Sequence, residues 1–122
     1  MAASPVSAPA AAPEISVVLP AYEEEQGIAR AVGRVRELLQ EGGVPWEIVV
    51  VDDGSRDGTT REAEAALGND GRVIRLPGNR GKGAAVREGM LAARGTFRIF
   101  LDADLAVDPR DIPTVVGLLR DG

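Results

Sequence analysis

The stretch Trp46-Glu47-Ile48-Val49-Val50-Val51-Asp52-Asp53-Gly54-Ser55 decides the fold class of this chain. Its apolar, β-branched part, residues 46–51, is the clearest strand in the sequence. Two aspartates and a Gly-Ser turn follow the strand directly. The same pattern, an apolar strand followed by polar side chains, recurs on both sides of this stretch. Functional residues are therefore to be sought at the ends of the strands.

Strands and helices alternate outward from this stretch. Short apolar runs predict further strands over residues 15–19, 72–76 and 97–101, of which 72–76 is less apolar and nearer an edge. Apolar residues at steps of three and four predict helices over residues 28–39, 59–67 and 85–93, and a last helix from Pro109 onward. This order predicts an α/β fold, Rossmann-like, with alternating βα units and a mostly parallel sheet.

Polar clusters stand at the carboxyl ends of all four predicted strands. Pro20, which is expected to end the first strand, leads into Ala21-Tyr22-Glu23-Glu24-Glu25, and the fourth strand leads into Asp102-Ala103-Asp104. The third strand leads into Asn79-Arg80-Gly81-Lys82-Gly83, which holds the only lysine of the chain. Because ligands bind outside the carboxyl ends of parallel strands, these segments are expected to gather at one edge of the sheet.

Most of these clusters also have a purely structural explanation. Asp53-Gly54-Ser55 fits a turn and a helix cap, Glu23 and Glu25 fit acids near a helix N-terminus, and Tyr22 fits a core aromatic. The pair Asp102 and Asp104 fits such an explanation less well, because two neighbouring carboxylates repel each other unless a cation lies between them. A hard divalent ion with oxygen ligands supplies that charge.

The composition narrows the chemistry. A length of 122 residues allows one compact domain, with 44% hydrophobic and 27% charged residues. The chain has no Cys and no His, which excludes disulfides, Cys/His zinc sites and catalysis by either side chain. The net charge of -5 disfavours nucleic-acid binding, and no apolar run is long enough to span a membrane. Residues 1–14, rich in Ala, Pro and Ser, predict a disordered tail.

Four ordered segments resemble the family 2 inverting glycosyltransferases of the GT-A fold. These segments are residues 18–24, 48–59, 79–86 and 101–104. Residues 80–95 are most similar to the dolichyl-phosphate glucosyltransferase branch, to which the dolichyl-phosphate mannose synthases are close. The resemblance implies that residues 15–122 are the nucleotide-sugar-binding part of a GT-A domain, truncated at the C-terminus, since such domains run about a hundred residues further.

The resemblance also implies roles for individual residues. Contacts with the nucleotide-sugar donor are expected from Pro20, Tyr22, Glu24, Val51, Asp53, Lys82, Asp102 and Ala103. Asp104 is expected to bind Mg²⁺ or Mn²⁺ at the donor diphosphate, and Asp102 and Asp104 are expected to be the catalytic carboxylates. Of the two adjacent aspartates, Asp53 rather than Asp52 is expected to face the nucleotide, because consecutive residues of a strand point to opposite sides. Ala106 departs from the family, whose members often carry a polar side chain there.

The implied reaction is transfer of a hexose from a UDP-glucose or GDP-mannose type donor to an acceptor, by metal-assisted inverting displacement. The expected acceptor is a polyprenyl or dolichyl phosphate, whose anionic oxygen needs little help from a general base. The resemblance implies a cytoplasmic protein at the inner face of the membrane. The expected partners are the membrane surface, bound peripherally by the full-length protein, and a second copy of the chain. Residues 1–122 alone are expected to show no transfer. Two alternatives stay open, a non-catalytic nucleotide-sugar-binding module and a metal-dependent phosphotransfer domain.

Overall fold

The computed structural model describes residues 12–102. Ala103, Asp104, Ala106, the helix expected from Pro109 and most of the expected N-terminal tail lie outside the described residues. The described elements alternate as expected from the sequence pattern. They are β1 (Ile15–Ala21), α1 (Ile28–Glu41), β2 (Trp46–Asp52), α2 (Thr59–Leu67), β3 (Gly71–Arg75), α3 (Lys82–Ala92) and β4 (Phe97–Phe100).

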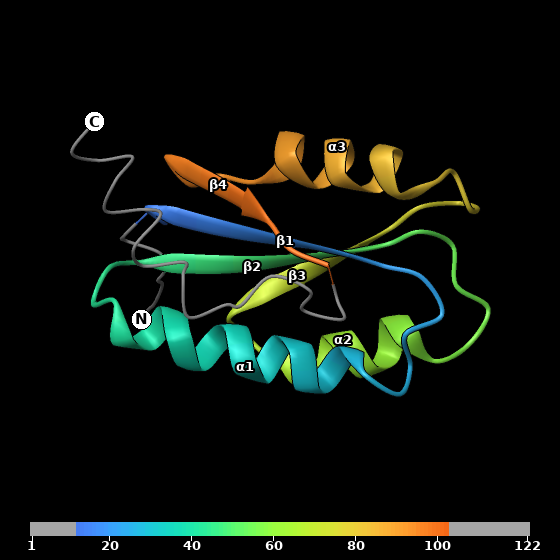
Figure 1. Cartoon of the computed structure of the whole chain (residues 1–122), viewed down its shortest axis with the longest axis horizontal. Coiled ribbons are helices and arrows are strands. Elements are labelled where there is room, and N and C mark those ends of the chain that lie inside the picture. Colours follow the sequence, from blue (N-terminus) through green and yellow to red (C-terminus); the bar gives the residue numbers. More distant parts are fainter. Residues whose placement is uncertain (1–11, 103–122) are drawn as a thin grey trace, which may run out of the picture.

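The strands form one sheet in the order β3-β2-β1-β4, and all three pairings are parallel. Helices α1 and α2 cover one face of this sheet, and α3 covers the other (Figure 1). The change of face follows from topology, because β4 pairs with β1 on the side away from β2 and a right-handed crossover then places α3 opposite α1. The expected α/β class with a parallel sheet is confirmed, and β3 lies at a sheet edge as predicted.

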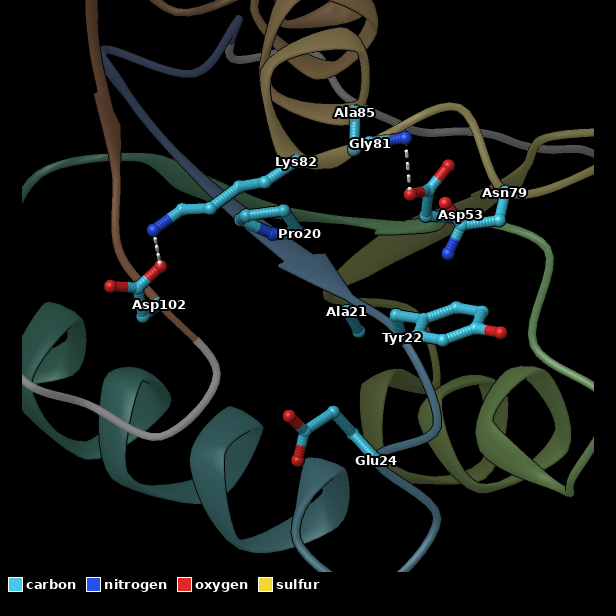
Figure 2. A pocket seen from close by; sticks show the side chains of 10 residues that line it. All are labelled: Pro20, Ala21, Tyr22, Glu24, Asp53, Asn79, Gly81, Lys82, Ala85 and Asp102. Carbon is cyan, nitrogen blue, oxygen red and sulfur yellow. Dashed lines mark hydrogen bonds and ion pairs between the residues drawn. The ribbon is translucent and has the colours of Figure 1, made fainter.

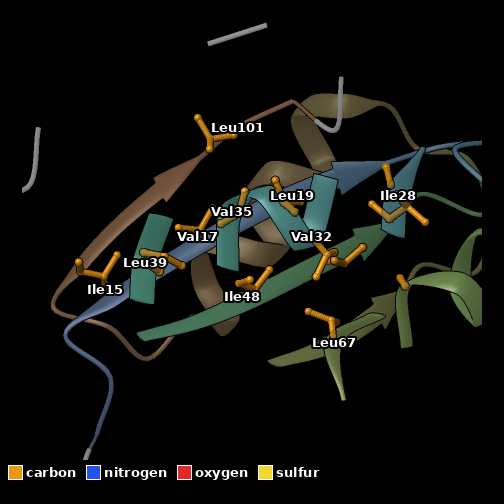
Figure 3. Close-up of a cluster of buried hydrophobic side chains, with 13 residues drawn as sticks. Ile15, Val17, Leu19, Ile28, Val32, Val35, Leu39, Ile48, Leu67 and Leu101 are labelled. Carbon is orange, nitrogen blue, oxygen red and sulfur yellow. The ribbon is translucent and has the colours of Figure 1, made fainter. Parts of the chain in front are cut away.

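The larger core lies between the sheet and the α1/α2 layer (Figure 3). Alternate residues of β1 and β2 meet the apolar stripe of α1 there, and their side chains are almost completely buried. The cluster includes Val17, Leu19, Ile28, Val32, Val35, Leu39, Ile48, Val50 and Leu67. Burial of each such side chain stabilises the fold by about 1.5–3 kcal/mol, so this face carries most of the stability.

The smaller core lies between the sheet and α3. Val18, Val49 and Val51 project from β1 and β2 to this side and are fully buried. Helix α3 packs closely here because position 89 has no side chain: a β-carbon on Gly89 would stand 2.3 Å from Cγ1 of Val18. The glycine therefore sets the distance between α3 and the sheet.

The first strand runs further than the sequence predicts. Pro20 was expected to end it, but β1 continues through Pro20 to Ala21, and Pro20 pairs in register with Val51. The backbone of Ala21 faces β2, since its carbonyl accepts a hydrogen bond from Asp53 N at 2.8 Å. Pro20 therefore faces the other side, where pairing with β4 has already ended at Val18. The missing N–H of proline costs no ladder hydrogen bond at such a position.

A buried carboxylate fastens the amino ends of the strands to α3. Glu47 accepts hydrogen bonds from Ser16 Oγ at 2.6 Å, Arg94 N at 2.7 Å and Arg72 Nη1 at 3.0 Å. Burial by itself raises the pKa of Glu47, but the hydrogen bonds from Arg94 and Ser16 and the charges of Arg72 and Arg94 outweigh it and hold the pKa below its ordinary value. The group is therefore ionised and structural, at the end of the sheet remote from the predicted site.

Candidate functional site

A cavity of about 470 Å³ opens at the carboxyl ends of the strands (Figure 2). Its walls come from the end of β1, the residues that follow β2 and β4, the loop before α3 and the first turn of α3. The lining residues are Pro20, Ala21, Tyr22, Glu24, Asp53, Asn79, Gly81, Lys82, Ala85 and Asp102. The parallel sheet thus brings all four sequence segments to one place, as the alternation of strands and helices predicts.

Most of the residues expected to contact a donor line this cavity. These are Pro20, Tyr22, Glu24, Asp53, Lys82 and Asp102. Val51 is placed differently, because its side chain is fully buried in the core beneath α3. Ala103 and Asp104 lie outside the described residues.

Ala21, Asn79, Gly81 and Ala85 line the cavity although the sequence analysis assigned none of them a role. Asn79 and Gly81 belong to the glycine-rich loop that was expected at this edge, so the loop was recognised without its individual residues. The sequence indicated Ala85 only as an apolar residue on one face of a predicted helix, and nothing in it pointed to a cavity there. Its position at the cavity depends on where α3 begins, which is Lys82.

The two adjacent aspartates at the end of β2 point to opposite sides. Asp53 accepts hydrogen bonds from Arg80 N at 2.7 Å and Gly81 N at 2.9 Å, one on each carboxylate oxygen. Asp52 accepts a hydrogen bond from Ser55 N at 2.8 Å and a short one from Thr60 Oγ1. Asp53 therefore fixes the loop that leads into α3 and stands at the cavity, whereas Asp52 fixes the turn that leads into α2.

Gly54 locks the turn after β2 against the loop before α3. Its φ of +79° lies in the left-handed region, and a β-carbon there would stand 2.5 Å from the carbonyl carbon of Gly78. Only glycine meets both conditions without strain. Together with the two hydrogen bonds of Asp53, this contact makes the two loops one unit, which positions Lys82 at the cavity.

An ion pair joins the two sides of the cavity. The ammonium group of Lys82 contacts the carboxylate of Asp102, and these side chains are 57% and 34% exposed. Figure 2 shows Lys82 reaching across the end of β1 toward Asp102, with Glu24 further down the same opening. Because both partners are partly in water, the pair contributes little to folding stability. The cavity therefore offers a cation and carboxylates that a charged ligand can reach.

The three consecutive glutamates divide their roles. Glu23 Oε2 accepts a hydrogen bond from Arg56 N at 2.6 Å, and Glu25 Oε1 accepts one from Gly58 N at 2.7 Å. Both carboxylates thus hold the loop before α2 and are structural. They do not stand in the first turn of the helix that follows them, because α1 begins at Ile28 and its first turn holds no acidic residue. Glu24 lies between them in sequence and lines the cavity. Only the middle glutamate is placed to meet a ligand.

The cavity contains the ligand type that a hard divalent cation requires. Its acidic side chains are carboxylates, and Mg²⁺ and Mn²⁺ prefer oxygen ligands. Within residues 12–102, however, no three acidic side chains come together closely enough to hold a metal ion. Asp102 is the last described residue and is paired with Lys82. The described part by itself therefore provides no complete set of protein ligands for a metal ion.

Comparison with curated proteins finds enzymes that transfer sugars to lipid phosphates. The chain is 38% identical over 110 residues to the dodecaprenyl-phosphate galacturonate synthase of Rhizobium johnstonii, an alignment that covers 88% of this chain and 32% of that protein. It is 43% identical over 100 residues to the dolichyl-phosphate beta-glucosyltransferase of Drosophila melanogaster, which covers 75% and 31%. The chain therefore spans about a third of the length of these relatives.

Comparison with solved structures finds the same fold. Glucosyl-3-phosphoglycerate synthase from Mycobacterium tuberculosis, solved in complex with Mn²⁺, uridine-diphosphate and phosphoglyceric acid, superposes with a TM-score of 0.72 at 33% identity. The match covers 90% of this chain and 40% of that one. It confirms the expected GT-A fold class. The sequence model of glycosyl transferase family 2 matches residues 16–122, so the chain belongs to that family.

Proposed function

We propose that this chain is the donor-binding part of a glycosyltransferase that moves a hexose from a nucleoside diphosphate sugar to a polyprenyl-type phosphate. The observation that carries the proposal is the cavity in which the end of β1, Asp53, Lys82 and Asp102 meet in a family 2 chain. Its volume of about 470 Å³ lies within the range of small-molecule sites, roughly 300–1,000 Å³. The acceptor class follows the relatives named for lipid phosphates, at 38% and 43% identity.

The cavity supplies matching chemistry for each part of a donor. Tyr22 is 44% exposed, so its ring can stack on a base. A carboxylate has about four acceptor sites, so Asp53 can still bind a ribose or base donor after it has accepted Arg80 N and Gly81 N. Lys82 stands in the first turn of α3, where its charge and the positive end of the helix dipole both favour a diphosphate.

The reaction needs charge neutralisation at the leaving group and an acceptor on the opposite face of the sugar. Asp104, together with Asp102, would hold a divalent cation, which would neutralise the negative charge that develops on the leaving diphosphate. Lys82 lies in the same cavity and adds to this neutralisation. An acceptor phosphate is already an anion, so inversion proceeds without a histidine base, which this chain lacks. With such an acceptor we expect the full-length protein to act at a membrane surface, and we propose the cytoplasmic, inner face.

Titration calorimetry with UDP and with GDP, each with and without Mn²⁺ or Mg²⁺, tests donor binding. We expect one nucleotide to bind in a metal-dependent way, and Asp104→Asn to weaken that binding at least about tenfold, which corresponds to about 1.4 kcal/mol. Glu41→Gln, an exposed carboxylate change at the far end of α1, is the matched control. No binding of either nucleotide, or equal affinity of the parent and the Asp104→Asn protein both with and without metal, contradicts the proposal.

Transfer of labelled glucose or mannose to polyprenyl phosphate by the full-length protein tests the acceptor, since residues 1–122 alone are expected to show no transfer. 3-Phosphoglycerate is the competing acceptor, because it is the phosphorylated acid named for the mycobacterial enzyme. Transfer to 3-phosphoglycerate alone would overturn the lipid acceptor while leaving the donor site intact. Metal-dependent donor binding without transfer to either acceptor would instead favour a non-catalytic nucleotide-sugar-binding module.

A further inference from the structure

The two faces of the sheet carry different charge patterns. Residues 76–100, which include α3 and β4, carry five basic side chains and one acidic one: Arg80, Lys82, Arg87, Arg94 and Arg98 against Glu88. Helices α1 and α2, on the opposite face, mix both signs. The contrast is notable in a chain whose net charge is -5. The segment that forms α3 and β4 therefore carries a net positive charge.

Two large apolar side chains are exposed on this same face. Leu91 is 68% exposed and stands one helical turn after the exposed Arg87 on α3. Phe100 is 48% exposed and pairs in register with Val18, whose side chain packs under α3, so Phe100 points to the α3 side of the sheet. We call Arg80, Arg87, Leu91, Arg94 and Phe100 the α3 surface.

The charges of the α3 surface are available to an external partner. Among the described residues, no acidic side chain pairs with the guanidinium of Arg80 or Arg87. Arg94 Nη2 lies 3.5 Å from Glu47 Oε1, but its side chain is 63% exposed. Arg80 and Arg87 also line a shallow cavity of about 470 Å³ beside the first turn of α3, together with Gly83, Ala84 and the single acidic residue Glu88. The surface therefore combines two arginines without an acidic partner among the described residues, Arg80 and Arg87, with a hollow and exposed apolar groups.

We propose that the α3 surface docks the protein on anionic phospholipid membranes. Arginines that surround exposed leucine and phenylalanine match the boundary between lipid headgroups and acyl chains, where charge and apolar area both contribute to binding. A two-fold dimer through this surface would bring arginines against arginines. A nucleic acid would leave Leu91 and Phe100 without a partner, since its backbone offers phosphates.

The position of α3 connects this surface to the cavity. The helix begins at Lys82, which lines the cavity, and Arg80 stands just before it. A membrane bound along α3 therefore lies next to the cavity opening, where a lipid-borne substrate would enter. Docking does not require sugar transfer, so vesicle binding without donor or acceptor tests it separately from the proposed function.

Co-sedimentation of the 122-residue chain with phosphatidylcholine vesicles, with and without phosphatidylglycerol, measures this docking. We expect binding only when phosphatidylglycerol is present, and weaker binding as salt is raised. The double variant Arg80→Gln/Arg87→Gln should lose about fivefold in affinity for each arginine removed. The matched control Arg30→Gln/Arg34→Gln removes two exposed arginines from α1, on the opposite face, and should bind like the parent. Arg87→Lys keeps the charge and should also bind like the parent.

Leu91→Gln distinguishes a membrane from a general polyanion. It should weaken vesicle binding by about tenfold, because apolar contact with lipid is lost, and should leave binding to heparin unchanged. Circular dichroism confirms that each variant keeps its secondary structure. Three results would overturn the proposal: no binding of the parent to anionic vesicles, equal losses in the α3 and α1 double variants, or vesicle binding that Leu91→Gln does not change.

Discussion

Asp53→Asn and Asp52→Asn form a matched pair that tests the site assignment. Both aspartates are buried, both accept two hydrogen bonds, and they are adjacent at the end of β2. Asparagine keeps one acceptor oxygen and turns an NH₂ group toward the second donor. At Asp53 the second donor is a backbone N–H, so one charge-assisted hydrogen bond is lost. At Asp52 the Thr60 hydroxyl can accept from the NH₂ group, but the ion pair with Arg75, 3.8 Å away, is lost. We therefore expect the free energy of unfolding to fall in both variants, by about 1.5–3 kcal/mol in Asp53→Asn. Urea denaturation followed by circular dichroism measures this loss.

Affinity for the nucleotide should separate the two variants. Only Asp53 lines the cavity, and only Asp53 holds the backbone of Arg80 and Gly81 in front of α3. We expect Asp53→Asn to weaken UDP or GDP binding by about tenfold, or 1.4 kcal/mol, and Asp52→Asn to weaken it by less than about threefold. Calorimetry under conditions where both variants are folded gives the comparison. Equal losses in the two variants, or a larger loss for Asp52→Asn, would refute the assignment of Asp53 to the nucleotide.

Three further changes test other parts of the structure. Lys82→Gln should weaken nucleotide binding by about tenfold in calorimetry, yet change the free energy of unfolding by less than about 1 kcal/mol, because its ion pair is partly exposed; a larger loss of stability would contradict this. In urea denaturation, Gly89→Ala should lower the free energy of unfolding by about 1–3 kcal/mol, since its β-carbon would stand 2.3 Å from Val18 Cγ1. Gly83→Ala, whose β-carbon would meet no atom within 4 Å, should instead stabilise α3 by up to about 1 kcal/mol. Equal losses of stability in the two variants would be evidence against the packing of α3. The pKa of Glu47 in the folded state lies below its ordinary value of 4.5. The stability that Glu47 adds relative to Glu47→Gln should therefore be complete above that pH and should decline as the pH falls through the lowered pKa. A difference in unfolding free energy between the two proteins that stays constant down to about pH 2 would disprove this role.

The elements themselves were predictable because their signals are local. The apolar run of residues 46–51 and the spacing of Ile28, Val32, Val35 and Leu39 each depend on a few neighbouring residues. Alternation of these elements then implied the parallel sheet, since parallel strands need crossover helices. For the same reason, the polar segments after the strands could be expected at one edge, and most of the predicted donor contacts do line the cavity.

The end of β1 was not predictable from local sequence. Proline usually ends a strand, but its effect depends on whether the neighbouring strand needs its N–H. At Pro20 the neighbouring strand β4 has already ended, and only the register of β1 with β4 shows this. The buried position of Val51 follows from packing in the same way, because the side of the sheet on which α3 lies decides which residues of β2 it covers.

The sequence by itself determined the order of strands and helices, the parallel sheet and the edge at which the polar segments meet. Only the tertiary structure decided which groups these polar residues bind: Asp52 holds the turn at Ser55, and Asp53 holds the loop at Arg80 and Gly81. It likewise showed that Glu23 and Glu25 hold the loop before α2. Only the tertiary structure showed that α3 and β4 gather arginines on one face. The physical reason is range: periodicity is set by neighbours along the chain, whereas a hydrogen bond such as that from Arg80 N to Asp53 joins residues 27 positions apart and exists only after the strands have packed.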